Sequence, residues 1–547
     1  MTHFTTATRK FRSTIFNRTI SRFLSSEARI YNRSRIGIGG SKLGQNPNLS
    51  HHSSVIATSL QNGITTFESG HDDNGEQYLS RGYQDAIKYL SETKSYDELQ
   101  VTLSGRLGYR SMTTSDEYPK DVIVKDYAGE TKNSDDSSRS GELKSKREAS
   151  NNDTVIHNLS KEYVSFCLSS SPLVELKKIH PNVNLLYMAH NPEVQGSDLA
   201  ATGASLDSVR SLVKKRLTDA FIGFEIGVAE KKITSYGVCS NGLSLPSSHP
   251  LHLSWEDVLS ASCDAVQKVR GQDGAIANLS TLQMPANVLE YHGLKVATKV
   301  KKFLASQSNE KSLHLPDSIN IHITRPLTCY PDRGTGTGYP FKMVDYQLPS
   351  SINDSNTSEQ WTNQNIGQTP PYYVLALNKA MRHFDATHLL EVSKNGKLTT
   401  EESETLDGAR LLQSMIHDLD SNLSSGLFRS FSAYEEELYT KIVPLIHDSF
   451  EELDEETSSV LQGFFKAYGN AVKKSIANTT RKLLKDGGVG VDSYIISDNL
   501  TLQESALQFL LKQQVSDSTI HLVDRVIVGC PQPEYVLQAV QAADNLE

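Results

Sequence analysis

A cluster of ionisable side chains follows a short apolar segment near residue 68. Residues 64–76 read ITTFESGHDDNGE, which predicts a buried strand with Ile64 and Phe67 facing inward and Glu68 at its end. Acids and a histidine come next, namely His71, Asp72 and Asp73. Carboxylates and imidazoles are the side chains that most often move protons in enzymes. We therefore expect this strand to end at the rim of an active site.

Polar residues also end other apolar segments of the chain. When parallel strands form a closed barrel, the side chains at their carboxyl ends meet on one face, where barrel enzymes carry out their chemistry. The polar residues in such positions are Arg106, His190, Ser240, Asn241 and Gln283.

The elements that would position these residues alternate regularly. Helix-like segments, such as GEQYLSRGYQDAIKYLSET, lie between most of the strand-like runs. The expected strands are residues 35–39, 63–68, 99–104, 183–190, 233–240, 275–283, 319–324 and 524–529. Eight alternations of strand and helix predict an α/β protein with a (β/α)₈ TIM barrel.

Two insertions interrupt this alternation. Residues 130–153 contain one large apolar residue, Leu143, and are predicted to form a disordered loop. The second insertion comes after strand seven and separates the barrel into 35–328 and 496–547. We expect residues 329–372 to form a flexible part rich in Gly, Pro and Ser, and residues 373–495 to form a helical part.

The helical insertion carries an apolar stripe at three- and four-residue spacing, typical of one buried helix face. The stripe is made of Val460, Leu461, Phe464, Phe465, Tyr468, Val472 and Ile476. The core of a helical bundle is its ordinary use. The insertion could also serve as a lid over the strand ends or as a surface for a protein partner.

The first 26 residues differ in composition from the rest of the chain. They hold five arginines and lysines, many serines and threonines, and no acid. This composition is typical of a mitochondrial or plastid transit peptide, and we expect a mitochondrial location. A basic tail on a cytoplasmic protein is the alternative.

Overall composition excludes several other classes. The net charge of −9 argues against a general nucleic-acid binder, and no run of about 18 apolar residues predicts a membrane span. The five cysteines are scattered without a C-x-x-C pair, which argues against a disulfide framework. The histidines at 383, 388, 417 and 447 lack metal-ligand spacing, so no metal site is expected. The run DRGTGTGY at 332–339 lacks the Lys-Ser/Thr of a phosphate-binding loop and is interpreted as a connector.

Six segments in order resemble the aldo-keto reductase family. They are RIGIGGSKLG, LLYMAHNPE, VAEKKITSYGVCSNGL, LSTLQMPANVLE, ITRPL and the C-terminal LQESALQFLL…DRVIVGCPQPEYVLQAV. The resemblance implies an NADPH or NADH cofactor at the carboxyl ends of the strands and hydride transfer to or from a small carbonyl or sugar-like substrate. The helical insertion has no counterpart in the family pattern.

The family's catalytic tetrad of Asp, Tyr, Lys and His is altered here. Against its D-T-x-x-x-Y-G motif, ESGHDDNG places Glu68 at the Asp position and Asp73, or Asp72 with a one-residue slip, at the Tyr position. Arg106, or less favourably Ser104, stands at the Lys position, and His190 is retained.

These changes remove the tyrosine-dependent mechanism as the family uses it. An arginine would pair Glu68 in a fork without relaying a proton. His190 becomes the candidate general acid, with His71 second, because an imidazole titrates near neutrality. A structural histidine without a catalytic role is the alternative reading of His190. Tyr330 or Tyr339 could also supply a phenol from a distant loop.

The expected cofactor contacts follow the same resemblance. Ser240, Asn241 and Gln283 match the residues that hold the nicotinamide carboxamide, and Tyr535 replaces the arginine that commonly binds the 2′-phosphate. The remaining expected contacts are Gly39, Pro326, Leu327, Gly529 and Gln532. The sequence thus predicts a divergent NAD(P)H-dependent oxidoreductase. The competing hypothesis is a catalytically silent barrel that acts as a cofactor-sensing or protein-interaction module.

Overall fold

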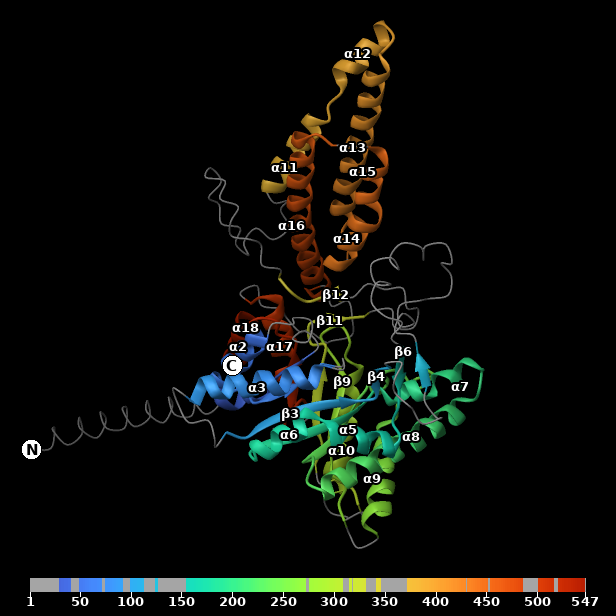
Figure 1. The fold of residues 1–547 in the computed structure, drawn as a ribbon, viewed down its shortest axis with the longest axis vertical. Helices are drawn as coiled ribbons and strands as arrows, with labels where there is room; N and C mark the ends of the chain where they lie inside the picture. Colours follow the sequence, from blue (N-terminus) through green and yellow to red (C-terminus); the bar gives the residue numbers. More distant parts are fainter. Residues whose placement is uncertain are drawn as a thin grey trace, which may run out of the picture. The chain divides into compact units, whose positions relative to one another are not determined.

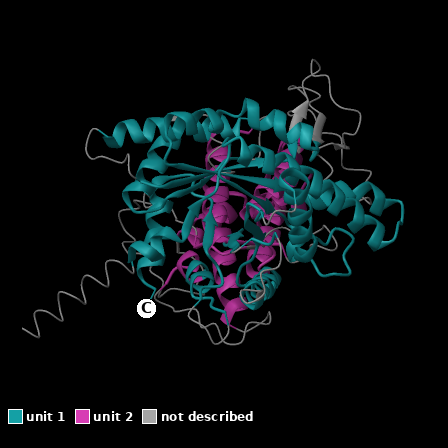
Figure 2. Cartoon of the chain, turned by 90° about the horizontal axis from the view of Figure 1, so that it is seen from below, with its two compact units in different colours: residues 1–326, 506–547 teal, residues 327–505 magenta. Residues whose placement is uncertain are grey.

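In the computed structural model, the chain folds into two compact units (Figures 1 and 2). The barrel unit comprises residues 1–326 and 506–547, and the helical unit comprises residues 327–505. The structure describes residues 29–40, 49–70, 74–91, 99–112, 123–125, 154–271, 275–307, 314–316, 318–330, 341–345, 371–428, 430–450, 453–485, 500–515 and 520–546. The expected transit peptide and the 130–153 loop lie outside these residues.

Eight parallel strands close the barrel in the order β1-β13-β10-β9-β8-β7-β3-β2. Their bounds are β1 Ile36–Ile38, β2 Thr66–Glu68, β3 Val101–Leu107, β7 Val183–His190, β8 Ser235–Cys239, β9 Leu279–Pro285, β10 Asn320–Thr324 and β13 Arg525–Val528. Each falls on one of the eight predicted segments, so the (β/α)₈ barrel is confirmed.

Helices surround these strands in the barrel unit, as Figure 2 shows. Their bounds are α2 Leu49–Gln61, α3 Gly75–Ser91, α5 Lys161–Ser170, α6 Pro172–Ile179, α7 Ser197–Ala201, α8 Leu206–Ala229, α9 Trp255–Arg270, α10 His292–Gln307 and α18 Pro533–Asp544, with 3₁₀ turns η2 Pro192–Gly196 and η3 Gly242–Ser244. Helix α17, Leu502–Leu511, crosses the boundary between the units.

Local signals in the sequence explain where several of these helices begin. Ser160, Ser205 and Ser254 each accept a hydrogen bond from a first-turn amide of α5, α8 and α9, which satisfies a backbone group that the helix leaves free. Helix α3 buries one apolar face that includes Leu79, Tyr83 and Leu90. Such a face packs on the outside of the barrel strands.

A small antiparallel sheet, which the sequence did not predict, separates β3 from β7. It has the order β4-β6-β5, with β4 at Tyr109–Met112, β5 at Ile123–Lys125 and β6 at Thr154–His157. Tyr109 pairs with His157 in this sheet. The sheet therefore places residues from both sides of the 130–153 segment next to the end of β3.

The helical unit has a core of its own. Its helices are α11 Pro371–His383, α12 Thr387–Asn395, α13 Thr400–Ser425, α14 Phe431–Glu437, α15 Val443–Ser449 and α16 Glu455–Lys485, with a π-helical turn η5 at Leu438–Ile442 and a two-stranded sheet of β11 Thr328–Cys329 and β12 Phe341–Lys342. Six of the seven predicted stripe residues are buried in this core, and Phe465 packs against it partly buried. The bundle-core interpretation of the stripe is confirmed.

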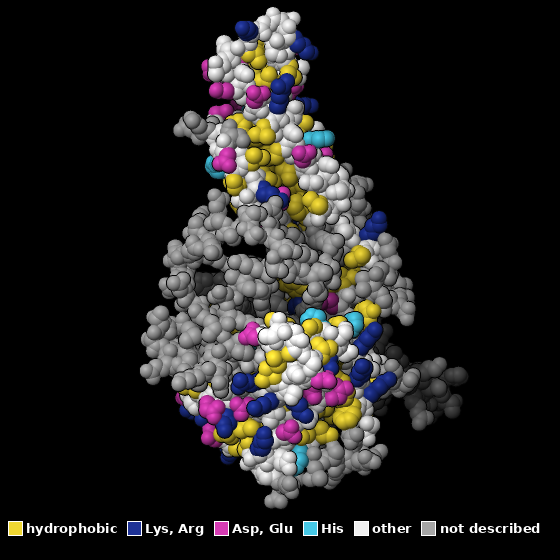
Figure 3. All heavy atoms as spheres, turned by 90° about the vertical axis from the view of Figure 1, so that its right-hand side faces the viewer, with side chains coloured by type: hydrophobic (Ala, Val, Ile, Leu, Met, Phe, Trp, Pro, Cys, Tyr) yellow, Lys and Arg dark blue, Asp and Glu magenta, His cyan; other side chains and the backbone are white. Residues whose placement is uncertain are grey.

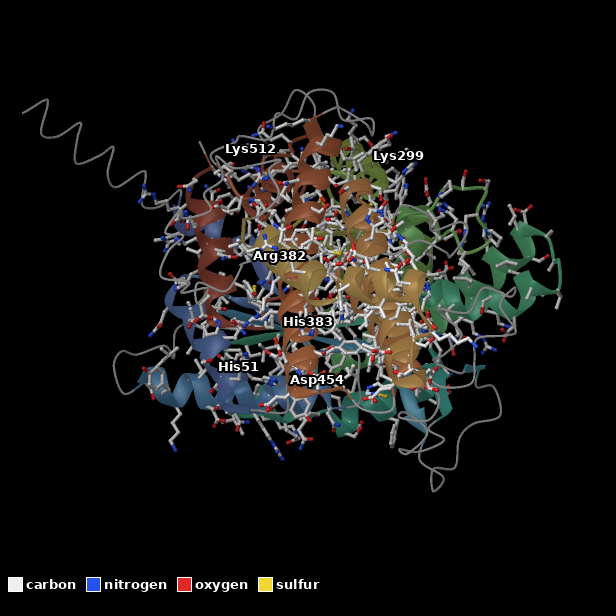
Figure 4. All side chains as sticks on the ribbon, turned by 90° about the horizontal axis from the view of Figure 1, so that it is seen from above. His51, Lys299, Arg382, His383, Asp454 and Lys512 are labelled. Atoms are coloured by element: carbon white, nitrogen blue, oxygen red, sulfur yellow. The ribbon has the colours of Figure 1, made fainter. Side chains whose placement is uncertain are left out.

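Capping interactions fix the starts of the long helices in this unit. Thr399 and Glu402 form a capping box at α13, and Asp454 accepts the Thr457 amide at 2.7 Å at the start of α16. His383, at the end of α11, contacts Thr457 at 3.0 Å, and Figure 4 labels it together with Asp454. Figure 3 shows apolar side chains gathered along the visible side of this unit.

Candidate active site

Three polar side chains from separate strands meet inside the barrel. Arg106 of β3 forms an ion pair with Glu68, the last residue of β2, through Nη2 and Oε2. Gln283 of β9 donates from Nε2 to the other carboxylate oxygen of Glu68, and its Oε1 accepts from Arg106 Nη2 at 3.3 Å. The predicted pairing of Glu68 with Arg106 is confirmed. The predicted fork is wrong. The same arginine nitrogen, Nη2, contacts both Glu68 and Gln283, and Nε has no partner among the described residues.

This network holds Glu68 as an acceptor. Both of its oxygens receive hydrogen bonds, and its side chain is fully buried. Arginine stays protonated in proteins, so the pair fixes geometry and does not pass a proton. A family-type activation of a phenol by lysine has no equivalent in this pair.

Buried polar atoms without a partner among the described residues surround this network. They are Ser69 Oγ, Ser104 Oγ and Arg106 Nε. Ser104 pairs with Glu68 in the sheet register, so its backbone lies directly beside the ion pair. Buried polar groups ordinarily have hydrogen-bond partners, so these atoms point to a polar ligand or ordered water at the ends of β2 and β3.

Cys239, at the end of β8, lies within the same electrostatic environment. The pKa of its thiol is raised to about 12, chiefly by burial; Arg106 opposes this shift, and Glu68 and Glu193 contribute to it. Because only a thiolate is an effective nucleophile, Cys239 serves here as a neutral packing residue.

His190 ends β7 next to Cys239, and a second histidine supports its backbone. The ring Nε2 of the fully buried His157 lies 2.8 Å from the His190 carbonyl oxygen, and its Nδ1 lies 2.5 Å from Gln195 Nε2. A carbonyl can only accept and an amide nitrogen can only donate, so His157 carries its proton on Nε2. This contact anchors the strand end that carries His190.

Tyr109 is the site residue that the sequence did not single out. Its ring packs edge-on against His190, with centroids 5.3 Å apart, and against His157, with centroids 4.6 Å apart. Gly108 makes this possible: its φ is +147°, and a Cβ there would lie 2.8 Å from His157 Nε2 and 2.9 Å from the His190 oxygen. The Gly-Tyr pair directly after strand three was the available signal.

The expected carboxamide residues are engaged within the protein. Ser240 donates its hydroxyl to Glu193 at 2.7 Å, and Glu193 also accepts the Gly242 amide at 2.9 Å. Gln283 is held by Glu68 and Arg106, while the side chain of Asn241 is exposed. The strands bring Ser240 and Gln283 together, since the Ser240 amide donates to the Gln283 carbonyl at 3.0 Å.

The other expected cofactor contacts lie at the ends of β1, β10 and β13. Gly39 packs closely on β13, because a Cβ there would lie 3.2 Å from Ile527. Gly529 follows β13, Gln532 is the N-cap of α18 without a side-chain capping bond, and Tyr535 lies half-buried in the first turn. Pro326 ends the barrel segment, and Leu327 begins the helical unit.

Several predicted residues fall outside this geometry. His71, Asp72, Asp73 and Tyr339 lie outside the described residues. Tyr330 belongs to the helical unit. The tyrosine-position substitute therefore stays a prediction, and Tyr109 is the described phenol next to His190.

The polar groups at the strand ends fit a nicotinamide cofactor, provided that Gln283 and Ser240 are released from their present partners. Ser104, Ser69 and Arg106 offer unpartnered polar atoms, and Gln283 and Ser240 carry the groups that a carboxamide needs. Gln283 and Ser240 would each have to exchange a present partner for the cofactor. In the first turn of α18, Pro533 has no amide N–H and the Tyr535 amide donates to the Gln532 carbonyl at 3.1 Å, so the Glu534 amide would be the donor to a phosphate oxygen.

Within the described residues, no group of three His, Cys, Asp or Glu side chains could hold a metal ion. None of the helices in the described part of the chain is both long and apolar enough to cross a membrane.

Comparisons with known proteins give little further information. No protein-family model matches the chain, and no curated protein matches it. Among solved structures, the chain is similar to a glycerol dehydrogenase from Gluconobacter oxydans, with 10% sequence identity, a TM-score of 0.34, and coverage of 94% of this chain and 86% of that chain. The assignment of the fold rests on the closed order of the eight strands.

Proposed function

We propose that this protein is an oxidoreductase of the aldo-keto reductase type, acting on a small carbonyl or sugar-like substrate with NADPH or NADH. The observation that carries the proposal is the packing of Tyr109 against His190 at the carboxyl end of β7. Hydride transfer to a carbonyl leaves negative charge on oxygen, so a phenol and an imidazole side by side are suited to that position.

The described residues would divide the work as follows. Tyr109 donates the proton from its hydroxyl to the substrate oxygen, and His190 orients the carbonyl. His157 holds the His190 backbone in place through its 2.8 Å contact. Arg106 and Glu68 provide a fixed dipole beside the site. The bound nicotinamide would supply or accept the hydride.

Substitution of Tyr109 by phenylalanine tests this proposal. The variant should lose about 10²- to 10⁴-fold in turnover, the usual contribution of a proton donor, while cofactor affinity stays unchanged. Steady-state kinetics on short aldehydes and 2-oxo compounds, with cofactor titration by fluorescence, would measure both.

Tyr373→Phe is the matched control, since it removes a hydroxyl that donates to Asp420 at 2.8 Å inside the helical unit. Its turnover should equal that of the wild type. If Tyr109→Phe turned over as fast as the wild type, Tyr109 would not be the proton donor. If His190→Ala lost activity while Tyr109→Phe kept it, His190 would be the general acid.

A silent barrel is the second candidate function. It is favoured by the engagement of Gln283 with Glu68 and Arg106, and of Ser240 with Glu193, because a tightly bound network resists exchange for a ligand. In this case the protein acts as a sensing or interaction module, with the helical unit as the partner surface.

Calorimetric titration with NADH and NADPH separates the two candidates. The oxidoreductase binds at least one cofactor, with a preference below about a hundredfold, or about 2.7 kcal/mol, because Tyr535 stands where an arginine would meet the 2′-phosphate. Absence of heat with both cofactors would leave the silent barrel.

We propose a mitochondrial location, supported by the acid-free, arginine-containing composition of residues 1–26. Fusion of these residues to a fluorescent protein should direct it into mitochondria. Plastid fluorescence would change the organelle, and diffuse cytosolic fluorescence would contradict an organellar signal.

A further inference from the structure

A row of basic side chains lies at the amino-terminal ends of β1 and β13 and continues to His322 of β10, which pairs in register with Gln283 of the candidate active site. Arg35 directly precedes β1, and the pairing of Ile36 with Val526 sets it beside Arg525, the first residue of β13. Arg525 in turn pairs with His322 of β10. Residues in register on neighbouring parallel strands project to the same side of the sheet. The three side chains therefore form one contiguous row.

Positive charge exceeds negative charge around this row. Lys301 of α10 binds Asp524 at 2.7 Å, and Arg525 donates to Thr66 at 2.7 Å. Among the described residues of the cluster, three cations (Arg35, Arg525 and Lys301) face a single carboxylate, that of Asp524. Buried charges in proteins are ordinarily paired. A surplus of two positive charges thus stays without a counter-charge.

The pKa shifts have the directions that such crowding produces. Burial lowers the pKa of Arg35 and of Arg525. The pKa of His322 is lowered to about 3 by burial first and by the charges of Arg525 and Lys301 second. His322 is therefore neutral at physiological pH and can donate one N–H.

Several donors of the cluster have no partner among the described residues. Arg35 is 2% exposed and donates from Nη2 to the Val523 carbonyl at 2.9 Å, whereas its Nε and Nη1 are unpartnered. The buried Nδ1 atoms of His322 and His521 also have no partner among the described residues, and each donates when it carries the ring proton. His521 lies on the ring of Tyr31, with centroids 5.7 Å apart, and the Arg35 guanidinium lies 6.0 Å from the centroid of that ring. Arg35 and His521 are thereby neighbours.

We propose that this cluster binds a phosphate group through Arg35, Arg525, His322 and His521. A phosphate carries about 1.5 to 2 negative charges at neutral pH and several acceptor oxygens, which matches the charge surplus and the number of unpartnered donors. The planar guanidinium group suits such an oxyanion because it presents two N–H groups side by side. Inorganic phosphate and the phosphoryl group of a metabolite share this chemistry.

Equilibrium dialysis of the full chain against labelled inorganic phosphate tests the site. The wild type should bind phosphate saturably, and Arg35→Gln should bind at least tenfold more weakly. Arg33→Gln is the matched control, because Arg33 pairs with Asp544 through two bonds of 2.6 Å and should leave phosphate affinity unchanged. Absence of saturable binding by the wild type, or equal affinity of Arg35→Gln, would overturn the proposal.

Thermal unfolding provides a second readout if Arg35→Gln folds poorly. Arg35→Met fills the space with an apolar chain and removes the buried charge, a replacement that proteins often tolerate. Phosphate should raise the melting temperature of the wild type more than that of Arg35→Met, at matched ionic strength. An equal rise in both would be a general salt effect and would overturn the site. Displacement of labelled phosphate by glycerol 3-phosphate would assign the site to phosphorylated metabolites, and failure to displace would assign it to the inorganic ion.

Discussion

Glu76, at the start of α3, is a buried acid whose protonation affects the fold. Burial raises the pKa of its carboxyl, while hydrogen bonds from Ser171 at 2.7 Å and Tyr187 at 2.9 Å oppose the shift. A carboxyl with a raised folded-state pKa stabilises the fold below its unfolded pKa of 4.5 and loses this contribution as pH rises through the folded value.

Replacement of Glu76 by glutamine should therefore stabilise the protein increasingly as pH rises. The amide keeps a carbonyl acceptor for Ser171 and Tyr187 and does not ionise. Urea unfolding at pH 4.5 and pH 7.5 would compare the two proteins, with the larger advantage of Glu76→Gln expected at pH 7.5. An advantage that is independent of pH would contradict the assignment.

The candidate site could be predicted in part at the level of residues. Glu68 and Arg106 lie at the carboxyl ends of neighbouring strands, and their positions in the family resemblance together with their opposite charges predicted the pairing. Tyr109 could not be assigned in this way. Its position depends on the positive φ of Gly108 and on contact with His157, which lies 48 residues further along and on a separate sheet strand. Contacts of this length leave no periodic signal in the sequence.

Replacement of two glycines by alanine is expected to have opposite effects on stability. A Cβ on Gly40, after β1, would overlap the Glu68 carbonyl oxygen and lie 2.5 Å from the Gly70 nitrogen, both backbone atoms. Gly463, inside α16, is exposed, and no described atom lies within 4 Å of the place where a Cβ would stand. The same substitution therefore has different costs at the two positions.

Gly40→Ala should destabilise the barrel unit by about 1–3 kcal/mol or more, because rigid backbone must move. Gly463→Ala should stabilise the helical unit by about 0.5–1 kcal/mol, the gain from replacing glycine in a helix interior. Chemical denaturation followed by circular dichroism would measure both changes. Destabilisation by Gly463→Ala would mean that α16 is packed on that side.

The barrel strands could be predicted because each is an apolar run that ends in polar residues. The small sheet of β4, β5 and β6 was missed for a physical reason. Its strands are short runs outside the regular alternation of strands and helices that reveals barrel strands of the same length, and β5 and β6 lie far apart in the chain. So short a run shows no measurable alternation, and only the pairing itself defines the strands.

At the scale of the whole molecule, the two units have separate hydrophobic cores. The core of the helical unit includes Tyr373, Phe464 and Tyr468, which are fully buried or nearly so. The insertion itself could be predicted, because the barrel pattern stops after strand seven and resumes near the last strand. The boundaries of its core could not, since the apolar stripe of α16 does not reveal which other helices cover it.

We expect calorimetry to resolve two unfolding transitions, one for each unit. Gly463→Ala should raise only the transition of the helical unit, by about 1–4 °C, and Gly40→Ala should lower only that of the barrel. A single transition that both variants shift together would show that the units unfold as one.

The sequence order of the two units also affects how the protein folds during synthesis. Strand β13, which lies between β1 and β10 in the barrel, is made only after the whole helical unit, residues 327–505. At roughly 5–20 residues per second, this segment delays the last strand by about 10–40 s. During that time the nascent chain carries seven strands with two unpaired edges, the kind of surface that pairs with other chains. A holding chaperone on the ribosome-bound chain is therefore expected to matter more for this barrel than for one without an insertion.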